Sequence, residues 1–89
     1  MTENPVTVSR IELGLSRREL CQVAGIRLDA LYQIEAGVVN VPHRRVMDFL
    51  ETVGRPKPAV LGAWRAYRAE VRQGVLDKVG AHSSEPKAR

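Results

Sequence analysis

The sequence predicts an all-α protein, a compact bundle of four to five helices that contains a helix-turn-helix and ends in an extended C-terminal helix. Three observations predict this class. Apolar residues recur at helical spacing along most of the chain, no segment alternates apolar and polar residues as a strand would, and glycines and prolines interrupt the helical pattern. The 89 residues, 44% of them hydrophobic, are enough for one small core.

The first two helices are predicted from their N-terminal signals. Asn4 is a good N-cap, and Pro5 after it suits the first position of a helix. Ser16 and Glu19 have the spacing of a capping box, in which each side chain accepts a hydrogen bond from the other residue's backbone N–H. The second helix is therefore expected over residues 17–24.

A third helix is expected over residues 28–36, with Leu31 and Ile34 facing inward and Gly37 as its C-terminal stop. Only the short segment around Gly25 separates it from the second helix. Because glycine tolerates a positive φ, the two helices are expected to cross at a steep angle rather than merge into one. This arrangement is a helix-turn-helix.

A fourth helix is expected after Pro42 and before Gly54. Its inward face is predicted to hold Val46, Phe49, Leu50 and Val53. The chain then divides into a helix-turn-helix domain over residues 1–55, a C-terminal helix within 56–79, and a tail over 80–89 with no apolar anchor, which we expect to be disordered.

The C-terminal helix, expected over residues 59–79, carries one apolar stripe. The stripe comprises Val60, Leu61, Trp64, Tyr67, Val71 and Val75. We expect Leu61 and Trp64 to cover the domain's own core. Tyr67, Val71 and Val75 are expected to pair across a two-fold axis in a homodimer, because their spacing resembles a short coiled-coil seam.

The composition and the missing motifs narrow the class of function. The net charge of +4 suits a polyanionic partner, although many domains carry such a charge for solubility alone. The single cysteine, Cys21, allows no intramolecular disulfide and is expected to be a buried core thiol. No signal peptide or membrane-spanning segment is recognised, so a cytoplasmic protein with no membrane partner is expected. No pattern typical of catalysis or metal binding is present, so we expect neither an enzyme nor a cofactor.

Over roughly residues 8–54 the sequence resembles the XRE or Cro-like helix-turn-helix family of bacterial and phage regulators. The resemblance is carried by Arg10, Gly14-Leu15-Ser16, Glu19-Leu20, Ala24-Gly25-Ile26, Leu31, Ile34-Glu35 and Gly37. It implies a sequence-specific binder of double-stranded DNA at the nucleoid, such as a phage repressor, an antitoxin or a restriction-modification controller. It also implies an ion pair between Arg10 and Glu35 that ties the first helix to the recognition helix.

The resemblance also implies that the third helix enters the major groove. The residues that would then face the bases are Arg27, Leu28, Asp29, Tyr32 and Gln33. An amide such as that of Gln33 can pair with adenine N6 and N7, and an arginine such as Arg27 can reach guanine O6 and N7.

Phosphate contacts are expected where cations stand at helix N-termini. The candidates are Arg17 at the start of the second helix and His43, Arg44 and Arg45 at the start of the fourth, with Asn40 in the loop before it. Positive side chains there are mildly unfavourable for the helix itself, so a phosphate between them would explain their presence. An ordinary exposed arginine pair is the alternative.

Two features depart from the family. Arg27 stands where Ser or Thr commonly caps the third helix, and a guanidinium cannot accept hydrogen bonds. The loop Val38–Val41 is rich in valine instead of polar and basic residues; we expect it to pack under the fourth and fifth helices, with a protein-contact surface as the alternative. A second function is therefore kept open: a protein-interaction module that uses this loop or the fifth helix and binds DNA only non-specifically.

Overall fold

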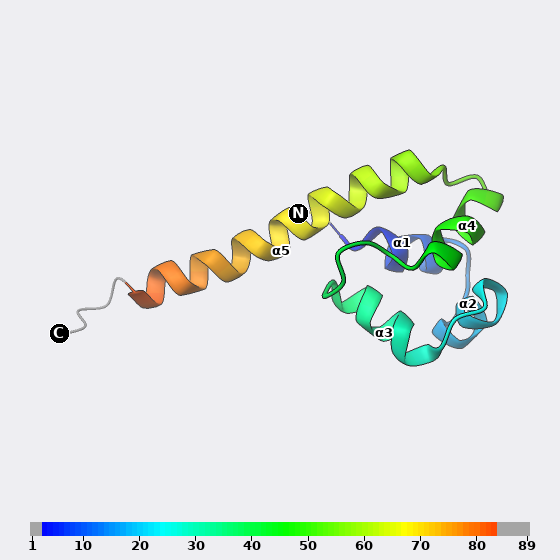
Figure 1. Cartoon of the computed structure of the whole chain (residues 1–89), viewed down its shortest axis with the longest axis horizontal. Coiled ribbons are helices and arrows are strands. Elements are labelled where there is room, and N and C mark those ends of the chain that lie inside the picture. Colours follow the sequence, from blue (N-terminus) through cyan, green and yellow to red (C-terminus); the bar gives the residue numbers. More distant parts are fainter. Residues whose placement is uncertain (1–2, 84–89) are drawn as a thin grey trace.

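The computed structural model describes residues 3–83, which form an all-helical structure. The helices are α1 (Pro5–Glu12), α2 (Arg17–Ala24), α3 (Leu28–Ala36), α4 (Arg44–Thr52) and α5 (Lys57–Ser83). The first four helices and the beginning of α5 form a globule, and the remainder of α5 projects from it (Figure 1). This projection makes the molecule 55 Å long and only 24 × 20 Å in cross-section. The predicted fold class is confirmed.

Asn4 caps α1 as predicted and also joins α1 to α3. Its side-chain oxygen accepts hydrogen bonds from the backbone N–H groups of Val6 and Thr7, at 2.9 and 3.2 Å. Its amide nitrogen donates to the carbonyl oxygens of Ile34 and Glu35, at 3.0 and 3.1 Å. Asn4 is only 7% exposed, so one buried side chain satisfies backbone groups at the start of α1 and at the end of α3.

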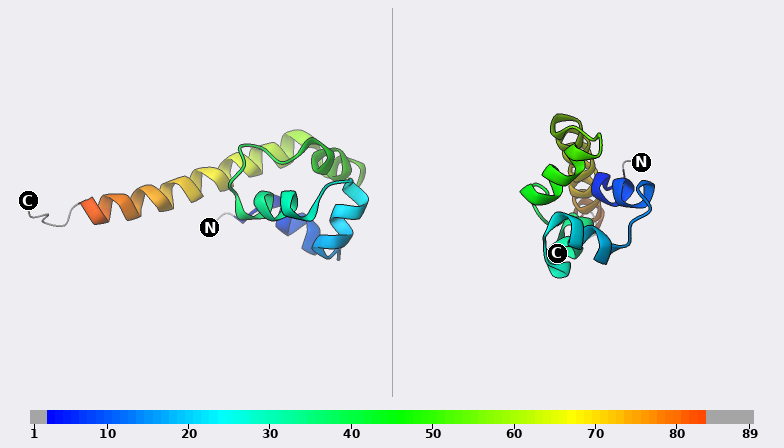
Figure 2. Two further views of the ribbon diagram at one scale, coloured as in Figure 1. Left: turned by 60° about the horizontal axis from the view of Figure 1, so that its bottom comes forward. Right: turned by 90° about the vertical axis from the view of Figure 1, so that its right-hand side faces the viewer.

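The helix-turn-helix has the local geometry that the sequence predicts. The capping box at the start of α2 is complete, with 3.1 Å from Glu19 N to Ser16 Oγ and 2.8 Å from Ser16 N to Glu19 Oε1. Gly25 ends α2 at φ 75°, the left-handed region that favours glycine. Arg27 is the N-cap of α3 and makes no side-chain capping bond, as expected. Consequently, α2 and α3 are separate helices that run in different directions (Figure 2).

The core lies where α1 to α4 meet the first half of α5. Its fully buried large side chains are Val6, Leu20, Leu31, Val46, Leu50 and Trp64. Cys21 is buried as predicted, and its burial raises the pKa of its thiol. One prediction for α4 is wrong: Val53 is 38% exposed, because α4 ends one residue before it, while Met47 is buried instead. Phe49 is partly buried against the core.

The first half of α5 is more deeply joined to the domain than the sequence predicts. Val60 and Trp64 are buried, at 6% and 0% exposure, and Leu61 is partly buried. Tyr67 also packs against this core, with its ring centroid 5.6 Å from that of Trp64. Its assignment to a dimer interface alone therefore needs correction, because much of its ring is covered within its own chain.

The end of α5 also differs from its prediction. The helix extends to Ser83, so the disorder expected from Gly80 onward is wrong for residues 80–83. The rest of the predicted tail, residues 84–89, lies outside the described residues. In the part of the chain that the structure describes, no helix is both long and apolar enough to cross a membrane.

Candidate nucleic-acid interface

The outward face of α3 carries the predicted base-reading side chains. Leu31 and Ile34 point into the core, which leaves Asp29, Tyr32 and Gln33 exposed on the opposite side. The Gln33 side chain makes no hydrogen bond within the part of the chain that the structure describes, so both its amide donor and its acceptor are available.

The start of α3 holds the other two predicted readers. Arg27 and Asp29 form an ion pair with 3.2 Å between Nε and Oδ1, and their side chains are 86% and 67% exposed. Because this ion pair is so exposed, it contributes little stability. Arg27 can therefore leave Asp29 and bind a base edge or a phosphate instead. Leu28 packs partly against the core, so only the rest of its surface is available to a ligand.

Arg17, predicted to bind phosphate, lies between two residues of α3. Its Nε is 3.1 Å from Oε1 of Glu35, and its guanidinium carbon is 5.3 Å from the centroid of the Tyr32 ring. These contacts are an ion pair and a cation–π interaction. The Arg17 side chain is still 46% exposed, so it can reach a phosphate beside the reading face only with the donors that these contacts leave free.

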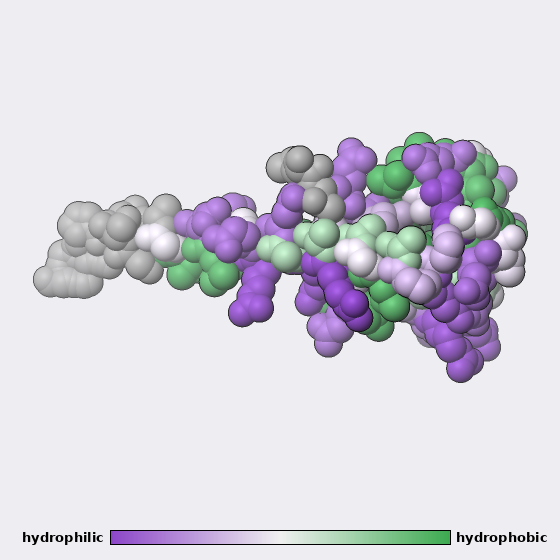
Figure 3. All heavy atoms as spheres, turned by 90° about the horizontal axis from the view of Figure 1, so that it is seen from above, coloured by the Kyte–Doolittle hydropathy of each residue, from purple (hydrophilic) through white to green (hydrophobic). Residues whose placement is uncertain are grey.

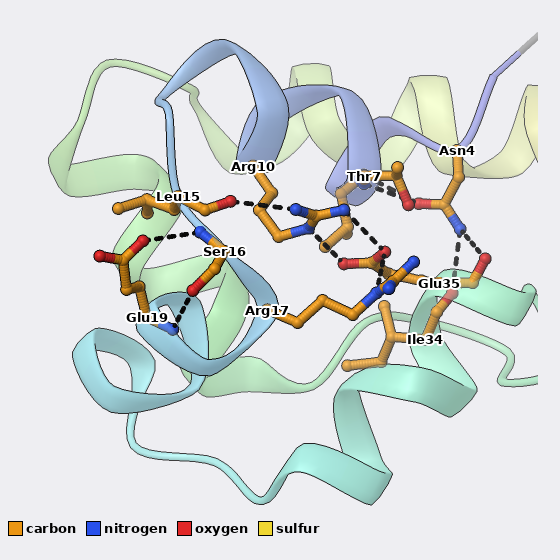
Figure 4. A network of polar contacts seen from close by, with 10 residues as sticks. Asn4, Thr7, Arg10, Leu15, Ser16, Arg17, Glu19, Ile34 and Glu35 are labelled. Carbon is orange, nitrogen blue, oxygen red and sulfur yellow. Dashed lines mark hydrogen bonds and ion pairs between the residues drawn. The ribbon is translucent and has the colours of Figure 1, made fainter.

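The ion pair expected between Arg10 and Glu35 is present and joins α1 to α3 (Figure 4). Arg10 Nε lies 2.8 Å from Glu35 Oε2, and Arg10 Nη1 donates to the carbonyl oxygen of Leu15 at 3.0 Å. The two charged side chains are 12% and 5% exposed. Because Glu35 accepts from both Arg10 and Arg17, its carboxylate fixes α3 against α1 and α2.

Three of the predicted DNA contacts meet between the turn of the helix-turn-helix and the start of α4. Arg27, His43 and Arg45 line an open hollow there, together with Gly25 and nearby apolar side chains. Arg45 Nη1 donates to the carbonyl oxygen of Gly25 at 2.8 Å, and His43 Nδ1 accepts from the backbone N–H of Arg45 at 3.0 Å. Because Nδ1 of His43 accepts this hydrogen bond, the ring hydrogen is on Nε2, which can donate it to another ligand. The hollow thus combines cations with a helix N-terminus, a combination that favours an anion.

Arg44, beside this hollow, is exposed and makes no hydrogen bond or ion pair within residues 3–83. Its positive charge contributes to the lowered pKa of Asp48, one turn along α4, but less than Lys57 does. Asp48 itself pairs with Lys57 at 2.7 Å, and the hydrogen bond from this lysine lowers the pKa of the Asp48 carboxyl. Arg44 is therefore the least constrained of the predicted phosphate-binding cations.

Asn40 lies in the loop between α3 and α4, where α5 holds it in place. Its carbonyl oxygen accepts from Nε1 of Trp64 at 2.9 Å, and its side-chain oxygen accepts from Nη2 of Arg68 at 3.3 Å. Nη1 of Arg68 also donates to the carbonyl oxygen of Gly37 at 2.6 Å. The side-chain oxygen of Asn40 is therefore engaged, and its amide N–H groups are the donors left for a phosphate.

The valines of this loop do not all pack as expected. Val39 is partly buried against the core, but Val38 and Val41 are 66% and 57% exposed. The prediction that the loop packs under the following helices is wrong for these two residues. The physical reason is that α5 holds the loop through hydrogen bonds to Gly37 and Asn40 rather than through buried valine side chains.

A second cationic group adjoins this loop and was missing from the predicted site. Arg65, Arg68 and Arg72 of α5 line a hollow together with Asn40 and Trp64. Their spacing of i, i+3 and i+7 places them on one face of a helix, which is the signal in the sequence that could have revealed the group. What the sequence does not show is that this face adjoins the α3–α4 loop.

In the part of the chain that the structure describes, no group of His, Cys, Asp and Glu side chains could hold a metal ion. Comparison of the chain with models of protein families, with curated proteins and with solved structures gives no match.

Proposed function

We propose that this protein is a sequence-specific, double-stranded DNA-binding transcriptional regulator of the XRE or Cro-like type, acting in the cytoplasm at the nucleoid. The observation that carries the proposal is the outward face of α3. This face belongs to the second helix of a helix-turn-helix, it is held rigidly through Glu35, and it presents the unpartnered amide of Gln33. A rigid helix with a free amide on its outer face suits recognition of base edges in a major groove.

In this proposal the contacts divide into two kinds. Gln33 reads an adenine through N6 and N7, and Arg27 exchanges its exposed ion pair with Asp29 for guanine O6 and N7. Arg44 and the hollow that includes His43 bind phosphates, which fix the position of α3 but carry no sequence information.

We further propose that the protein binds DNA as a homodimer. A single helix-turn-helix of this size contacts only a few base pairs, and a second copy on a neighbouring half-site adds specificity. Val71 and Val75 on the projecting half of α5 are 38% and 55% exposed and are the candidate contact between the copies, together with the partly buried Tyr67.

The division of roles is tested by two substitutions measured on matched and scrambled duplexes. Gln33→Ala is expected to lose about 1–3 kcal/mol on the preferred site and to relax the preference at one base pair. Arg44→Ala is expected to weaken binding to all sequences alike and to lower the slope of log K against log salt by about one. Two variants that behave identically on both duplexes would contradict the assignment.

The second candidate function is a protein-interaction module that keeps this fold. The observation that favours it is the exposure of Val38 and Val41 beside the reading helix. Such a module would bind DNA only non-specifically, with Kd in the range of about 10⁻⁴ to 10⁻⁶ M at physiological salt. Substitution of both valines by serine separates the two functions, because a DNA-binding regulator should keep its sequence preference.

A further inference from the structure

The helix α5 has charged faces of opposite sign. At 3.6 residues per turn, Arg65, Arg68 and Arg72 fall within an arc of about 60°, and Glu70 and Asp77 lie about 150° or more from its centre. Hydrophilic side chains project from both edges of α5 when the molecule is seen from above (Figure 3). No carboxylate is among the residues that line the hollow on the arginine face.

These arginines do not all have a structural role. Arg68 holds the α3–α4 loop through its hydrogen bonds to Gly37 and Asn40. Arg65 and Arg72 are exposed and have no hydrogen bond or ion pair within the described part of the chain. Like charges three and four residues apart on a helix repel one another, so this arrangement is unfavourable for α5 alone and favourable beside a polyanion.

The position of the arginine face indicates which polyanion it meets. It adjoins Asn40, whose amide N–H groups are free, and the same loop leads directly to His43 and Arg44 at the start of α4. Only residues 41 and 42 of the loop therefore separate Asn40, on the arginine face, from the predicted phosphate contacts at the start of α4. The cations on α5 cover about 10 Å of the helix axis, since each residue advances about 1.5 Å.

We infer that the arginine face of α5 is a second contact with the DNA backbone, outside the helix-turn-helix, in which Arg65, Arg72 and the Asn40 amide bind phosphates flanking the bases read by α3. This inference rests on the proposed function, because it requires that DNA is the ligand. It adds contacts that increase affinity and its dependence on salt without adding sequence information.

The test measures Kd of the full chain on its preferred duplex and on a scrambled duplex at several salt concentrations. Arg72→Gln should lower the slope of log K against log salt by about one on both duplexes, and Arg65→Gln with Arg72→Gln should lower it by about two. Lys57→Gln is the matched control, because it removes one positive charge from the first turn of the same helix, where the Lys57 amino group pairs with Asp48 and belongs to neither the arginine face nor the dimer stripe. This control should leave the slope unchanged.

The position of the contact is checked by hydroxyl-radical footprinting of the same duplex. The intact chain should protect backbone positions beside the half-site that the double variant leaves open. An unchanged slope and footprint in the double variant would overturn the inference, and so would an equal loss in Lys57→Gln, which would indicate a general effect of net charge.

The failure of this inference is distinguishable from failure of the proposed function. If the arginine variants have no effect but Gln33→Ala still relaxes the sequence preference, α5 does not contact the DNA backbone. The proposal of a DNA-binding regulator is then unaffected. If the intact chain shows no preference for any duplex, the proposed function itself is wrong. If it binds no DNA at all, both are wrong.

Discussion

The two halves of α5 have the same secondary structure but very different surroundings. The first half, residues 57–68, contributes Val60 and Trp64 to the core and holds the α3–α4 loop. In the second half every residue from 69 to 80 is exposed. An isolated helix of about 12 residues is marginal in water, so the second half is helical mainly because it continues an anchored helix. The comparison teaches that the first half stabilises the domain, whereas the second half leaves its side chains uncovered and contributes little to the core.

The largest expected effect on stability comes from the anchored half. Trp64→Ala should cost about 3–5 kcal/mol, because it empties a fully buried site and removes the hydrogen bond to Asn40. Val75→Ala, in the projecting half, should change stability by less than about 0.5 kcal/mol at protein concentrations too low for dimers to form. Urea denaturation followed by circular dichroism measures both, since Trp64 is the single tryptophan and fluorescence would be lost with it. Equal costs would remove the distinction between the halves.

The next effect concerns the ion pairs that fix α3. Glu35→Gln should cost about 3 kcal/mol, because it leaves the Arg10 guanidinium, only 12% exposed, without its counter-charge. Arg10→Met should cost less, because Glu35 keeps its ion pair with Arg17. Combining Arg10→Met with Glu35→Gln should recover part of the loss. Thermal melts of the three variants test this, and equal stability in all of them would show that the ion pair does not fix α3.

A smaller effect, the difference in stability between two glycine variants, is expected where α3 ends against α5. Gly37 has φ 76°, and a Cβ added to it would lie 2.6 Å from the hydroxyl oxygen of Tyr67. Gly14 is the matched control, with φ 74° and no atom within 4 Å of an added Cβ. Both alanine variants carry the cost of a left-handed residue, about 1–2 kcal/mol, and Gly37→Ala should cost about 1–3 kcal/mol more for the overlap. If the extra cost persists in a Tyr67→Ala background, the close approach is not its cause.

The smallest effect on stability is expected from shortening α5. A chain that ends at Arg72 keeps Trp64 and Tyr67, so its free energy of unfolding should change by less than about 0.5 kcal/mol at protein concentrations too low for dimers to form. Light scattering should nevertheless give a dimer for the intact chain and a monomer for the shortened one, because Val75 is removed. An intact chain that stays monomeric both free and on DNA would defeat the proposed dimer.

The sequence predicts the secondary structure correctly wherever the signal lies within a few neighbouring residues. The capping box of Ser16 and Glu19, the N-cap at Asn4 and the turn at Gly25 depend on residues within a few positions of one another, and all were predicted correctly. The helix-turn-helix follows from the capping box and the turn at Gly25, and the exposed face of α3 follows from the inward spacing of Leu31 and Ile34.

The sequence does not predict the contacts that join residues far apart in the chain. The hydrogen bond from Arg68 to Gly37 joins residues 31 positions apart, and no periodicity predicts it. The exposure of Val38 and Val53 depends on where neighbouring helices begin and end, so hydropathy alone placed Val53 in the core and Val38 under the following helices. The Arg10–Glu35 ion pair was expected only because the resemblance to a family implied it.

The central claim is that α3 reads a DNA sequence, and the most direct measurement is the selection of bound duplexes from a random pool at fixed salt. The account predicts that the intact chain enriches one site. The Gln33→Ala variant should enrich the same site, except that one of its base pairs is no longer specified. Enrichment of no site by the intact chain, with uniform weak binding across the pool, would contradict the account.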